Sequence, residues 1–511
     1  MAAVVYGVNG PVLTVLGENF TMGEMVRVNG LLGEVIRLEA RQATVQLYES
    51  AAGIKPGALV EKTERPLSLT LRPGLIGGIF DGIMRPLSQG KADKWHVTVT
   101  ARQGELLGEG AIFAEVKETE IVTYRAMLPS GVFGEVTYAA ADGEYCHDEE
   151  IIKIGGRGVS LSQTWSIRVP RAVKRKLPAA IPLITGQRVI DSLFPIAMGG
   201  TCAIPGGFGT GKTMTQHQIA KHCNADIIIY IGCGERGNEM TEVLESFAGL
   251  KDPKSGFPLL MRTVLIANTS DMPVAAREAS IYTGITLAEC YRDMGYHVAV
   301  MADSTSRWAE ALRELSARLE ELPAEEGYPA YLAARIASFY ERAGYVENLN
   351  GTHGSVTIIG AVSPQGADFS EPVTLHTKRF TRCFWALDRR LAYARHFPSI
   401  NPSLSYSGYL PELDKWYKEN IDPLFPEYRE KILQILYKEE ILLETVKLVG
   451  ADALSAEETA LLAAARRIRK TFTAQNAFDE VDTFCALERQ FEIMRGVCGG
   501  GGIGLRDKRM D

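Results

Sequence analysis

The sequence predicts a multidomain fold in which an N-terminal β-barrel, an inserted β module, a central α/β domain and a C-terminal helical domain follow one another. The chain has 511 residues, and single hydrophobic cores stop growing at roughly 250–300 residues. The apolar pattern also changes twice, from alternation to short continuous runs after residue 178 and to helical spacing after residue 400. The predicted domains are 1–72, 73–165, 166–400 and 401–511.

Short alternating segments fill the first 70 residues. Val26–Val28 and Thr44–Leu47 alternate apolar and polar side chains, and glycines separate such segments at Gly30, Gly33, Gly53 and Gly57. This pattern is typical of a small antiparallel barrel. From residue 86 to 153 the sequence stays polar and strand-like, which predicts the inserted β module and shows no catalytic motif.

Short apolar runs alternate with segments able to form helices in the central region. The runs are Cys202–Ile204, Ile227–Ile231, Val264–Ala267, Val298–Ala302 and Val356–Val362. The helical segments include Lys212–His222, Glu239–Phe247, Val274–Met294 and Thr305–Leu319. Apolar strands that alternate with helices predict a parallel sheet covered on both faces.

Helical spacing of apolar residues dominates from Asn401 onward, and we expect no further strand there. Glu427–Lys447 and Ala456–Thr471 carry apolar residues three and four positions apart, which predicts two amphipathic helices.

Composition limits the partners and the compartment that we expect. A net charge of −7 gives no electrostatic reason to expect nucleic acid or an anionic membrane. The eight cysteines are scattered without a C-x-x-C pair, which favours reduced thiols over a zinc site or disulfide framework. The sequence shows no signal peptide and no apolar run near the ~18 residues that span a bilayer. We therefore expect a cytoplasmic protein that reaches any membrane through partners.

A glycine-rich segment stands between a predicted strand and a predicted helix and matches G-x-x-x-x-G-K-[ST]. Its glycines let consecutive backbone N–H groups curl round phosphate oxygens, and the helix N-terminus adds partial positive charge. Lys212 is placed to reach the β- and γ-phosphates, and the Thr213 hydroxyl to complete a magnesium shell. A chance glycine-rich turn is the alternative, which the Lys-Thr pair and both flanking elements disfavour. The candidate nucleotide-binding residues of this phosphate loop are Gly206, Gly207, Phe208, Gly209, Thr210, Gly211, Lys212 and Thr213.

Charged residues follow two further predicted strands. Glu235 and Arg236 come just beyond Ile227–Ile231, and ligands of open parallel sheets sit at such carboxyl ends. The alternative for this pair is a surface charge pair that caps a helix. Asp303 ends Val298–Ala302 and fits the second magnesium-linked position of phosphate-loop proteins, through water, although it could also be the N-cap of the next helix. The polar loop Ser363–Asp368 after another strand is a candidate sensor of the γ-phosphate.

Together these motifs resemble the catalytic A subunit (alpha chain) of V-type and A-type rotary ATPases, and a bacterial member in particular. The likeness runs from near the N-terminus to about Arg495. The stretches that carry it are Pro182–Asp191, Gly206–Thr213, Gly234–Glu239, Asn268–Glu278, Met301–Glu310 and Ser363–Asp368.

The resemblance implies a RecA-like nucleotide-binding domain that uses ATP or ADP with Mg²⁺. It implies that Glu235 polarises the attacking water, with Lys212, Arg236 and Asp303 as further catalytic residues and Arg307 nearby. Phe208 belongs to the loop and shapes it. Phe397 and Phe478 are implied as adenine contacts, with an ordinary core position as the alternative.

The resemblance also implies partners. It implies a hexamer in which the chain alternates with non-catalytic B subunits, each of which donates an arginine to the γ-phosphate. Central and peripheral stalk subunits, and indirectly a membrane sector that moves protons or sodium ions, complete the complex. The chain would then be peripheral to the membrane, and no nucleic acid is expected.

Two stretches depart from the family pattern. Ser88–Trp95 replaces a longer stretch, so we expect a shortened inserted module. The glycine-rich Val497–Asp511 cannot sustain a helix, so the C-terminal helical domain is expected to be truncated.

Two related classes are the alternatives. The non-catalytic partner subunit typically lacks the intact Lys-Thr loop and the base, and this chain has both. A related hexameric ATPase for secretion or RNA translocation lacks the inserted module together with Gly234–Glu239, and no aromatic-basic nucleic-acid surface is visible.

Overall fold

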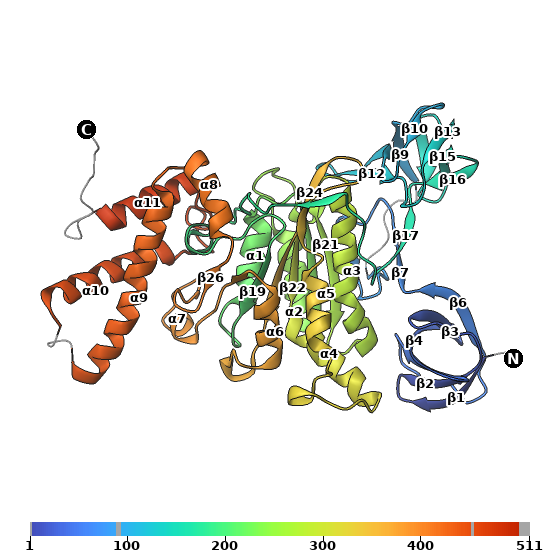
Figure 1. Ribbon diagram of the computed structural model, residues 1–511, viewed down its shortest axis with the longest axis horizontal. Helices are drawn as coiled ribbons and strands as arrows, with labels where there is room; N and C mark the ends of the chain where they lie inside the picture. The colour runs from blue at the N-terminus through green and yellow to red at the C-terminus, as the bar shows by residue number, and fades with distance from the viewer. Residues whose placement is uncertain (1–2, 88–93, 451–453, 500–511) are drawn as a thin grey trace. The chain divides into compact units, whose positions relative to one another are not determined.

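The computed structural model describes residues 3–87, 94–450 and 454–499. The chain forms two compact units, and Figure 1 labels their elements. The first comprises the described parts of Met1–Lys176, Asp226–Arg342 and Val346–Val356, and the second those of Leu177–Ala225, Ala343–Tyr345 and Thr357–Asp511.

A six-stranded antiparallel barrel begins the first unit. Its strands run in the order β1-β2-β5-β4-β3-β6 and are β1 (Val4–Asn9), β2 (Val12–Leu16), β3 (Glu24–Val28), β4 (Leu31–Glu39), β5 (Gln42–Leu47) and β6 (Val60–Pro66). The Val5 N–H donates to the Ala58 carbonyl and the Val60 N–H to the Ala3 carbonyl, both at 2.9 Å, which closes the barrel. Alternate side chains fill its interior with valine and leucine, so the predicted barrel is confirmed.

The inserted module contains two four-stranded sheets, β10-β13-β15-β16 and β12-β11-β9-β14. The bounds are β9 (Lys94–Val99), β10 (Leu106–Leu107), β11 (Ile112–Lys117), β12 (Thr123–Met127), β13 (Gly134–Ala139), β14 (Gly143–Cys146), β15 (Glu150–Ile154) and β16 (Arg157–Ser160). β7 (Ser68–Leu71) pairs with β17 (Gln163–Ser166). A β-rich insertion is therefore confirmed, and most of the stretch predicted to be shortened, residues 88–93, lies outside the described residues.

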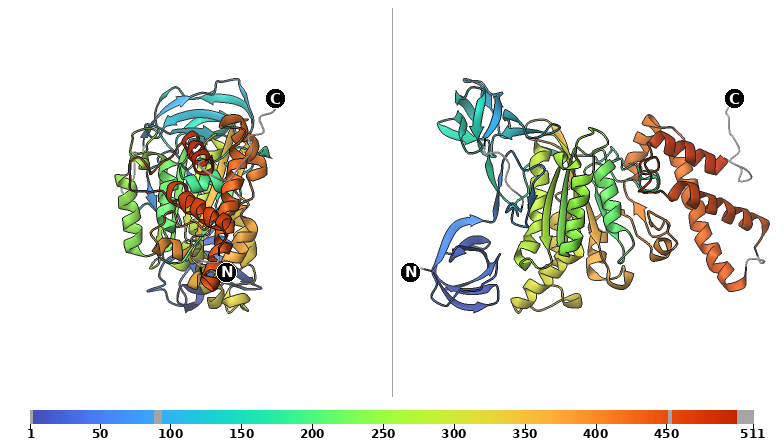
Figure 2. Two further views of the ribbon diagram at one scale, coloured as in Figure 1. Left: turned by 90° about the vertical axis from the view of Figure 1, so that its left-hand side faces the viewer. Right: turned by 180° about the vertical axis from the view of Figure 1, so that it is seen from behind.

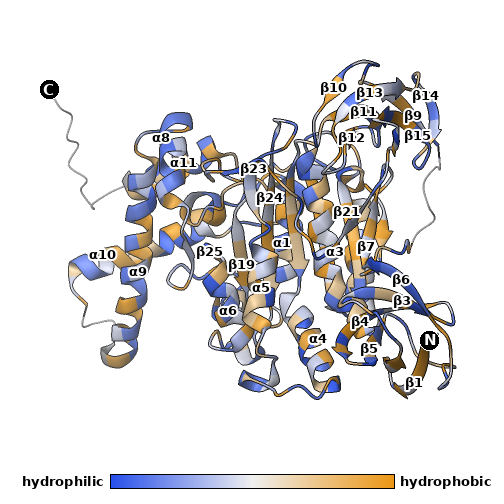
Figure 3. Cartoon of the chain, turned by 45° about the vertical axis from the view of Figure 1, so that its right-hand side comes forward, coloured by the Kyte–Doolittle hydropathy of each residue, from blue (hydrophilic) through white to orange (hydrophobic). Residues whose placement is uncertain are grey.

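Parallel strands form the α/β part of the first unit, in the order β22-β20-β21-β8. The elements are β8 (Ile79–Phe80), β20 (Ile227–Glu235), β21 (Thr263–Thr269), β22 (His297–Asp303), α2 (Gly237–Gly249), α3 (Val274–Asp293), α4 (Thr305–Arg318) and α5 (Leu332–Tyr340). The strands are almost wholly buried and strongly apolar, as the orange of β21 in Figure 3 shows. β8 lies within the range predicted for the inserted module, yet it pairs with β21, a long-range contact that two residues do not reveal in sequence.

The second unit has its own strands, in the order β26-β25-β19-β24, with β19 parallel to both neighbours. The bounds are β19 (Thr201–Pro205), β24 (His353–Val362), β25 (Cys383–Phe384), β26 (Tyr406–Ser407), α1 (Lys212–His222), α6 (Pro372–Phe380) and α7 (Arg389–Tyr393). The short strands β18 (Arg175–Leu177) and β23 (Gly344–Glu347) pair with each other, and β23 also pairs with β24. The expectation of no strand after Asn401 is wrong, because β26 pairs with β25; two residues are too few for a period-two pattern.

In the described residues after Tyr409, four α-helices and a short π-helix (Arg469–Thr473) form the C-terminal part, coloured orange to red in Figure 2. The α-helices are α8 (Leu410–Asn420), α9 (Phe425–Val449), α10 (Ala456–Ile468) and α11 (Leu487–Gly499). Ser455 and Glu458 form a capping box that starts α10. Stacked rings of Tyr417, Phe425 and Phe491 join α8, α9 and α11, with centroids 4.6 and 5.8 Å apart. The predicted helical domain is confirmed, and the glycine-rich end from residue 500 lies outside the described residues.

All eight cysteines lie in described segments and carry free thiols. Within residues 3–87, 94–450 and 454–499, none of the helices is long and apolar enough to cross a membrane.

We predict that Leu13→Ala destabilises the barrel by about 2–5 kcal/mol, because the fully buried side chain leaves a cavity in a closed interior. Differential scanning calorimetry of the full chain would show a lower transition temperature for the barrel. Tyr6→Ala is the matched control, since that side chain is exposed in the same barrel. Equal shifts for the two variants would contradict this account of the barrel core.

Candidate active site

The phosphate loop of the second unit joins β19 to α1 and depends on glycine at several positions. Gly209 and Gly211 have φ values of +76° and +90°, which L side chains rarely adopt. A Cβ on Gly206 would lie 2.5 Å from the Thr210 hydroxyl. That hydroxyl is buried and donates to the Gly207 carbonyl at 2.8 Å. The loop therefore has a backbone conformation that requires glycine, and it ends at the N-terminus of α1, where backbone N–H groups can bind anions.

Lys212 and Thr213 are the first two residues of α1. The Lys212 ammonium donates to the carbonyls of Gly206 and Gly207 at 2.7 and 3.0 Å, so its charge lies over the loop. The Gly206 N–H donates to the Val362 carbonyl at 3.1 Å, and the polar loop Ser363–Asp368 therefore starts beside the phosphate loop. The Phe208 side chain is 85 % exposed, so it does not shape the loop by packing against it as a buried ring would.

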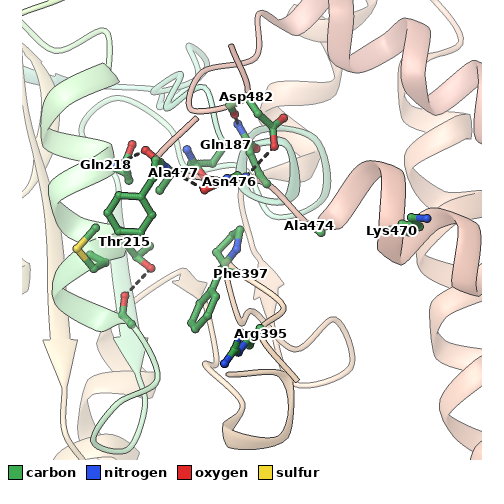
Figure 4. A pocket seen from close by; sticks show the side chains of 15 residues that line it. Gln187, Thr215, Gln218, Arg395, Phe397, Lys470, Ala474, Asn476, Ala477 and Asp482 are labelled. Carbon is green, nitrogen blue, oxygen red and sulfur yellow. Dashed lines mark hydrogen bonds between the residues drawn. The ribbon is translucent and has the colours of Figure 1, made fainter. Parts of the chain in front are cut away.

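A cavity of about 510 Å³ opens beside the start of α1, within the size range of small-molecule sites. Four parts of the chain line it: Gln187, the start of α1, the residues around Phe397, and a stretch of the C-terminal part between Lys470 and Asp482. In Figure 4, Thr215 and Gln218 lie on α1, Asn476 and Asp482 lie at the top of the cavity, and Phe397 lies below them near Arg395.

Both predicted adenine contacts line this cavity. Phe397 is 41 % exposed and Phe478 is 85 % exposed. The alternative of an ordinary core position is therefore wrong for both residues. An exposed ring beside a phosphate loop offers a stacking face for a planar base.

The predicted carboxylates come together in the first unit. Glu235 ends β20 and Asp303 ends β22, and these parallel strands pair with Gly232 opposite Asp303. Asp303 is 4 % exposed and accepts a hydrogen bond from the Tyr230 hydroxyl at 3.2 Å. The structure therefore places both acids at the same edge of the strand pair.

The pKa of Glu235 is raised from 4.5 to about 8. Burial is the main cause, followed by the negative charge of Asp303 and then by a hydrogen bond and repulsion from Glu239. The positive charge of Arg307 opposes the rise. A carboxyl group with a pKa near neutrality is suited to accept a proton.

Neither capping alternative applies. Glu235 lies in the strand, and Arg236 occupies the N-cap position of α2 without a capping hydrogen bond from its exposed side chain. The N-cap position of α4 belongs to Ser304 rather than to Asp303. Arg307 is exposed on α4 and pairs with Glu310 at 2.9 Å.

Arg277, a residue that received no role from the sequence, lies in the same cluster. A Cβ on Gly234 would meet the Arg277 side chain at 2.9 Å, and a guanidinium N–H of Arg277 donates to the Ser270 carbonyl at 2.9 Å. Its Nε is buried and makes no hydrogen bond. Arg277 stands in the Asn268–Glu278 stretch that carried the resemblance, and this was the only signal for it.

No group of three His, Cys, Asp or Glu side chains that could hold a metal by itself occurs in the described parts of the chain.

Comparison with known proteins identifies the family. The nucleotide-binding domain model of the ATP synthase alpha/beta family matches residues 186–407, and its β-barrel and barrel-sandwich models match 5–64 and 86–168. The model of the C-terminal domain of V and A type ATP synthase matches residues 414–499. The V-type ATP synthase alpha chain 2 of Clostridium tetani is 55 % identical over 522 residues, which cover 97 % of this chain and 88 % of the relative. The chain belongs to the family of V-type and A-type ATP synthase alpha chains.

Other members of this family agree. The corresponding A subunit of the A-type ATP synthase of Methanopyrus kandleri is 53 % identical over 516 residues, which cover 96 % of this chain and 87 % of the relative. The assembled ATPase EscN from the type III secretion system of enteropathogenic E. coli has a TM-score of 0.71 at 21 % identity, covering 97 % of this chain and 99 % of EscN. At that identity the likeness shows the fold alone. The predicted family and fold class are therefore confirmed, and the family of catalytic subunits is favoured over both alternatives.

We predict that Glu235→Gln raises the melting temperature of the chain at alkaline pH. Because the pKa of Glu235 is raised on folding, the folded wild type loses stability as pH rises from 4.5 to 8. The difference in melting temperature between the variant and the wild type should be near zero at pH 4. It should grow between pH 4.5 and 8 and stay constant above pH 8. Thermal denaturation across pH measures it.

Glu242→Gln, at an exposed position of α2, is the control and should show no such growth with pH. A pH-independent difference for Glu235→Gln would contradict the burial and repulsion inferred at Glu235.

Proposed function

We propose that the chain is the catalytic subunit of a rotary V/A-type ATPase, which hydrolyses or makes ATP in coupling with proton or sodium transport. The observation that carries this is the complete phosphate loop together with Glu235, whose pKa is raised to about 8. Both occur in a chain that is 55 % identical to a V-type ATP synthase alpha chain.

The second unit supplies nucleotide binding. The N–H groups of the phosphate loop and the Lys212 ammonium hold the phosphates. The bonds of the Lys212 ammonium to the Gly206 and Gly207 carbonyls already place its charge over the loop. The adenine ring lies in the adjacent cavity against Phe397 and Phe478. Gly211 lines the cavity and belongs to the loop, which supports a single ligand with a phosphate end and an aromatic end.

The first unit supplies hydrolysis. Ionised Glu235 accepts a proton from the water that attacks the γ-phosphate, and its raised pKa supports this role. Arg236 and Arg307 lend positive charge beside a site where negative charge develops. The Ser363–Asp368 loop of the second unit, beside the phosphate loop, senses the γ-phosphate.

Mg²⁺ fits the donor set. The Thr213 hydroxyl and the Asp303 carboxylate are hard oxygen ligands of the kind Mg²⁺ prefers, and Asp303 would act through water. When bound, Mg²⁺ neutralises phosphate charge.

We also propose the partners. The chain alternates with B subunits in a hexamer, and each B subunit donates an arginine to the γ-phosphate. Central and peripheral stalk subunits connect this hexamer to the ion-translocating membrane sector, so the chain works peripherally to the membrane. Its membership of the V/A-type ATP synthase family supports assembly into a rotary complex.

Glu235→Gln should lower turnover of the assembled complex by roughly 10²–10⁴, the usual contribution of a general base. Binding of MgATP should survive, because the substitution leaves the phosphate loop intact. Steady-state hydrolysis and equilibrium binding measure the two effects. The matched control, Glu242→Gln, should hydrolyse normally, and unchanged hydrolysis by Glu235→Gln would overturn the role of Glu235.

The isolated chain should hydrolyse ATP slowly, because an arginine supplied by a neighbour contributes on the order of 10³–10⁵ in rate. Turnover measured at low protein concentration, before and after addition of the B subunit, tests this. Fast turnover by the chain alone would contradict the need for an arginine from the partner.

A further inference from the structure

We infer that Arg188 and Gln475 are positioning residues for base selectivity: they hold the segment that carries Phe478 at the wall of the cavity. This inference rests on the proposed function, since it takes the cavity beside α1 as the adenine site. We call residues 474–482 the wall segment. It comes from the C-terminal part of the sequence, nearly 300 residues after Arg188, which is the N-cap residue of a short π-helix (Val189–Leu193).

The Arg188 side chain bridges the two ends of the wall segment. It is 6 % exposed, and its Nε and Nη2 donate to the carbonyls of Phe472 and Ala474 at 2.9 and 2.5 Å. Its Nη1 pairs with the Asp482 carboxylate at 2.6 Å. A single guanidinium therefore holds both ends of the wall segment, the use for which its planar array of donors is suited.

Gln475 fastens the same segment from within. It is 4 % exposed, and its side-chain amide donates to the carbonyls of Gly186 and Asp482, both at 2.8 Å. Its Oε1 accepts from the Arg188 N–H, and its own N–H donates to the Phe397 carbonyl, also at 2.8 Å. Gln475 thus ties the wall segment to the backbone of the other aromatic residue of the cavity.

The Phe478 ring has no comparable support of its own. It is 85 % exposed, while its N–H donates to the Asn476 Oδ1 at 3.0 Å, and the Asn476 N–H donates to the Asp482 carboxylate at 2.7 Å. The position of the ring therefore depends on the backbone of the wall segment. That backbone depends on Asp482, Gln475 and Arg188.

Arg188 acts on the base end of the cavity alone. Its side-chain hydrogen bonds go to the wall segment and to Phe472, whereas the Thr210 hydroxyl and the Lys212 ammonium bond to carbonyls of the phosphate loop. Removing the guanidinium should release Phe478 and weaken base stacking while the phosphates still bind. Stacking of a base on an aromatic side chain contributes roughly 1–3 kcal/mol, which corresponds to about a 5- to 150-fold change in affinity.

The test compares binding of MgATP with binding of magnesium tripolyphosphate, which lacks base and sugar. Isothermal titration of the full-length chain gives the ratio of the two affinities. We expect Arg188→Gln to lower the affinity for ATP about 5- to 150-fold and to change the tripolyphosphate affinity less than about twofold. An unchanged ratio in a folded Arg188→Gln chain would overturn the inference.

Arg429→Gln is the matched control. Arg429 is an equally buried arginine of the same unit, and its Nε donates to the Ser192 carbonyl at 2.6 Å while Nη1 pairs with Asp414. It touches neither the wall segment nor the lining of the cavity. Its loss should lower stability and leave the affinity ratio unchanged; an equal fall of the ratio would make the Arg188 effect merely structural and overturn the inference.

A second variant covers the case in which Arg188→Gln does not fold. Asp482→Asn keeps the size of the side chain and removes the charge that Arg188 pairs with. We expect it to reduce the ratio in the same direction by a smaller factor, and an unchanged ratio would overturn the inference.

The wild type distinguishes failure of the inference from failure of the proposed function. If it binds tripolyphosphate as tightly as ATP, the cavity is not an adenine site, and the proposed nucleotide contacts fail together with the inference. If it prefers ATP and both variants keep that preference, the proposed function stands and only the inference fails.

Discussion

A strand buried on both faces can carry polar chemistry only where it ends, and this constraint places Glu235, Asp303 and the phosphate loop at the carboxyl ends of β20, β22 and β19. β20 is apolar through Ile231 and reaches a carboxylate at Glu235, and β22 is apolar through Ala302 and reaches Asp303. β19 is buried throughout and leads directly into the phosphate loop. Because uncompensated charge inside such strands would be costly, the functional groups gather at the carboxyl ends.

The same burial sets the chemistry of Glu235. Burial of the Glu235 carboxyl group and the negative charge of Asp303 beside it raise its pKa to about 8. Full burial would make ionisation of the Glu235 carboxyl group too costly. Full exposure would leave its pKa at the ordinary low value, and the carboxylate would then be a weak base. The positive charge of Arg307, on α4, lowers the pKa of Glu235 and so opposes this rise. The Arg277 side chain, on α3, lies next to Gly234, so two different helices place positive charge near the acid.

The base end of the cavity follows a different principle. No regular element presents Phe478; an irregular segment does, and its shape is maintained by buried polar side chains. Arg188 and Gln475 donate to backbone carbonyls in and beside this irregular segment, which pairs buried backbone groups that no sheet or helix pairs there. In the proposed function, binding of the phosphates relies on backbone geometry local to one loop, whereas binding of the base relies on long-range hydrogen bonds.

The sequence by itself determined the order of domains, the phosphate loop, and the strand-end acids Glu235 and Asp303, because apolar runs and glycine spacing are local signals. The helix Lys212–His222 was placed with its observed bounds for the same reason. Only the tertiary structure decided that Phe397 and Phe478 are exposed beside one cavity, that Arg277 joins the acids, and that Arg188 holds the wall segment. The short strands β8 and β26 also belong to this second group. Most of these features depend on partners far along the chain, and contacts between distant residues leave no periodic pattern in the sequence; β8 and β26 are also only two residues long, too short for such a pattern.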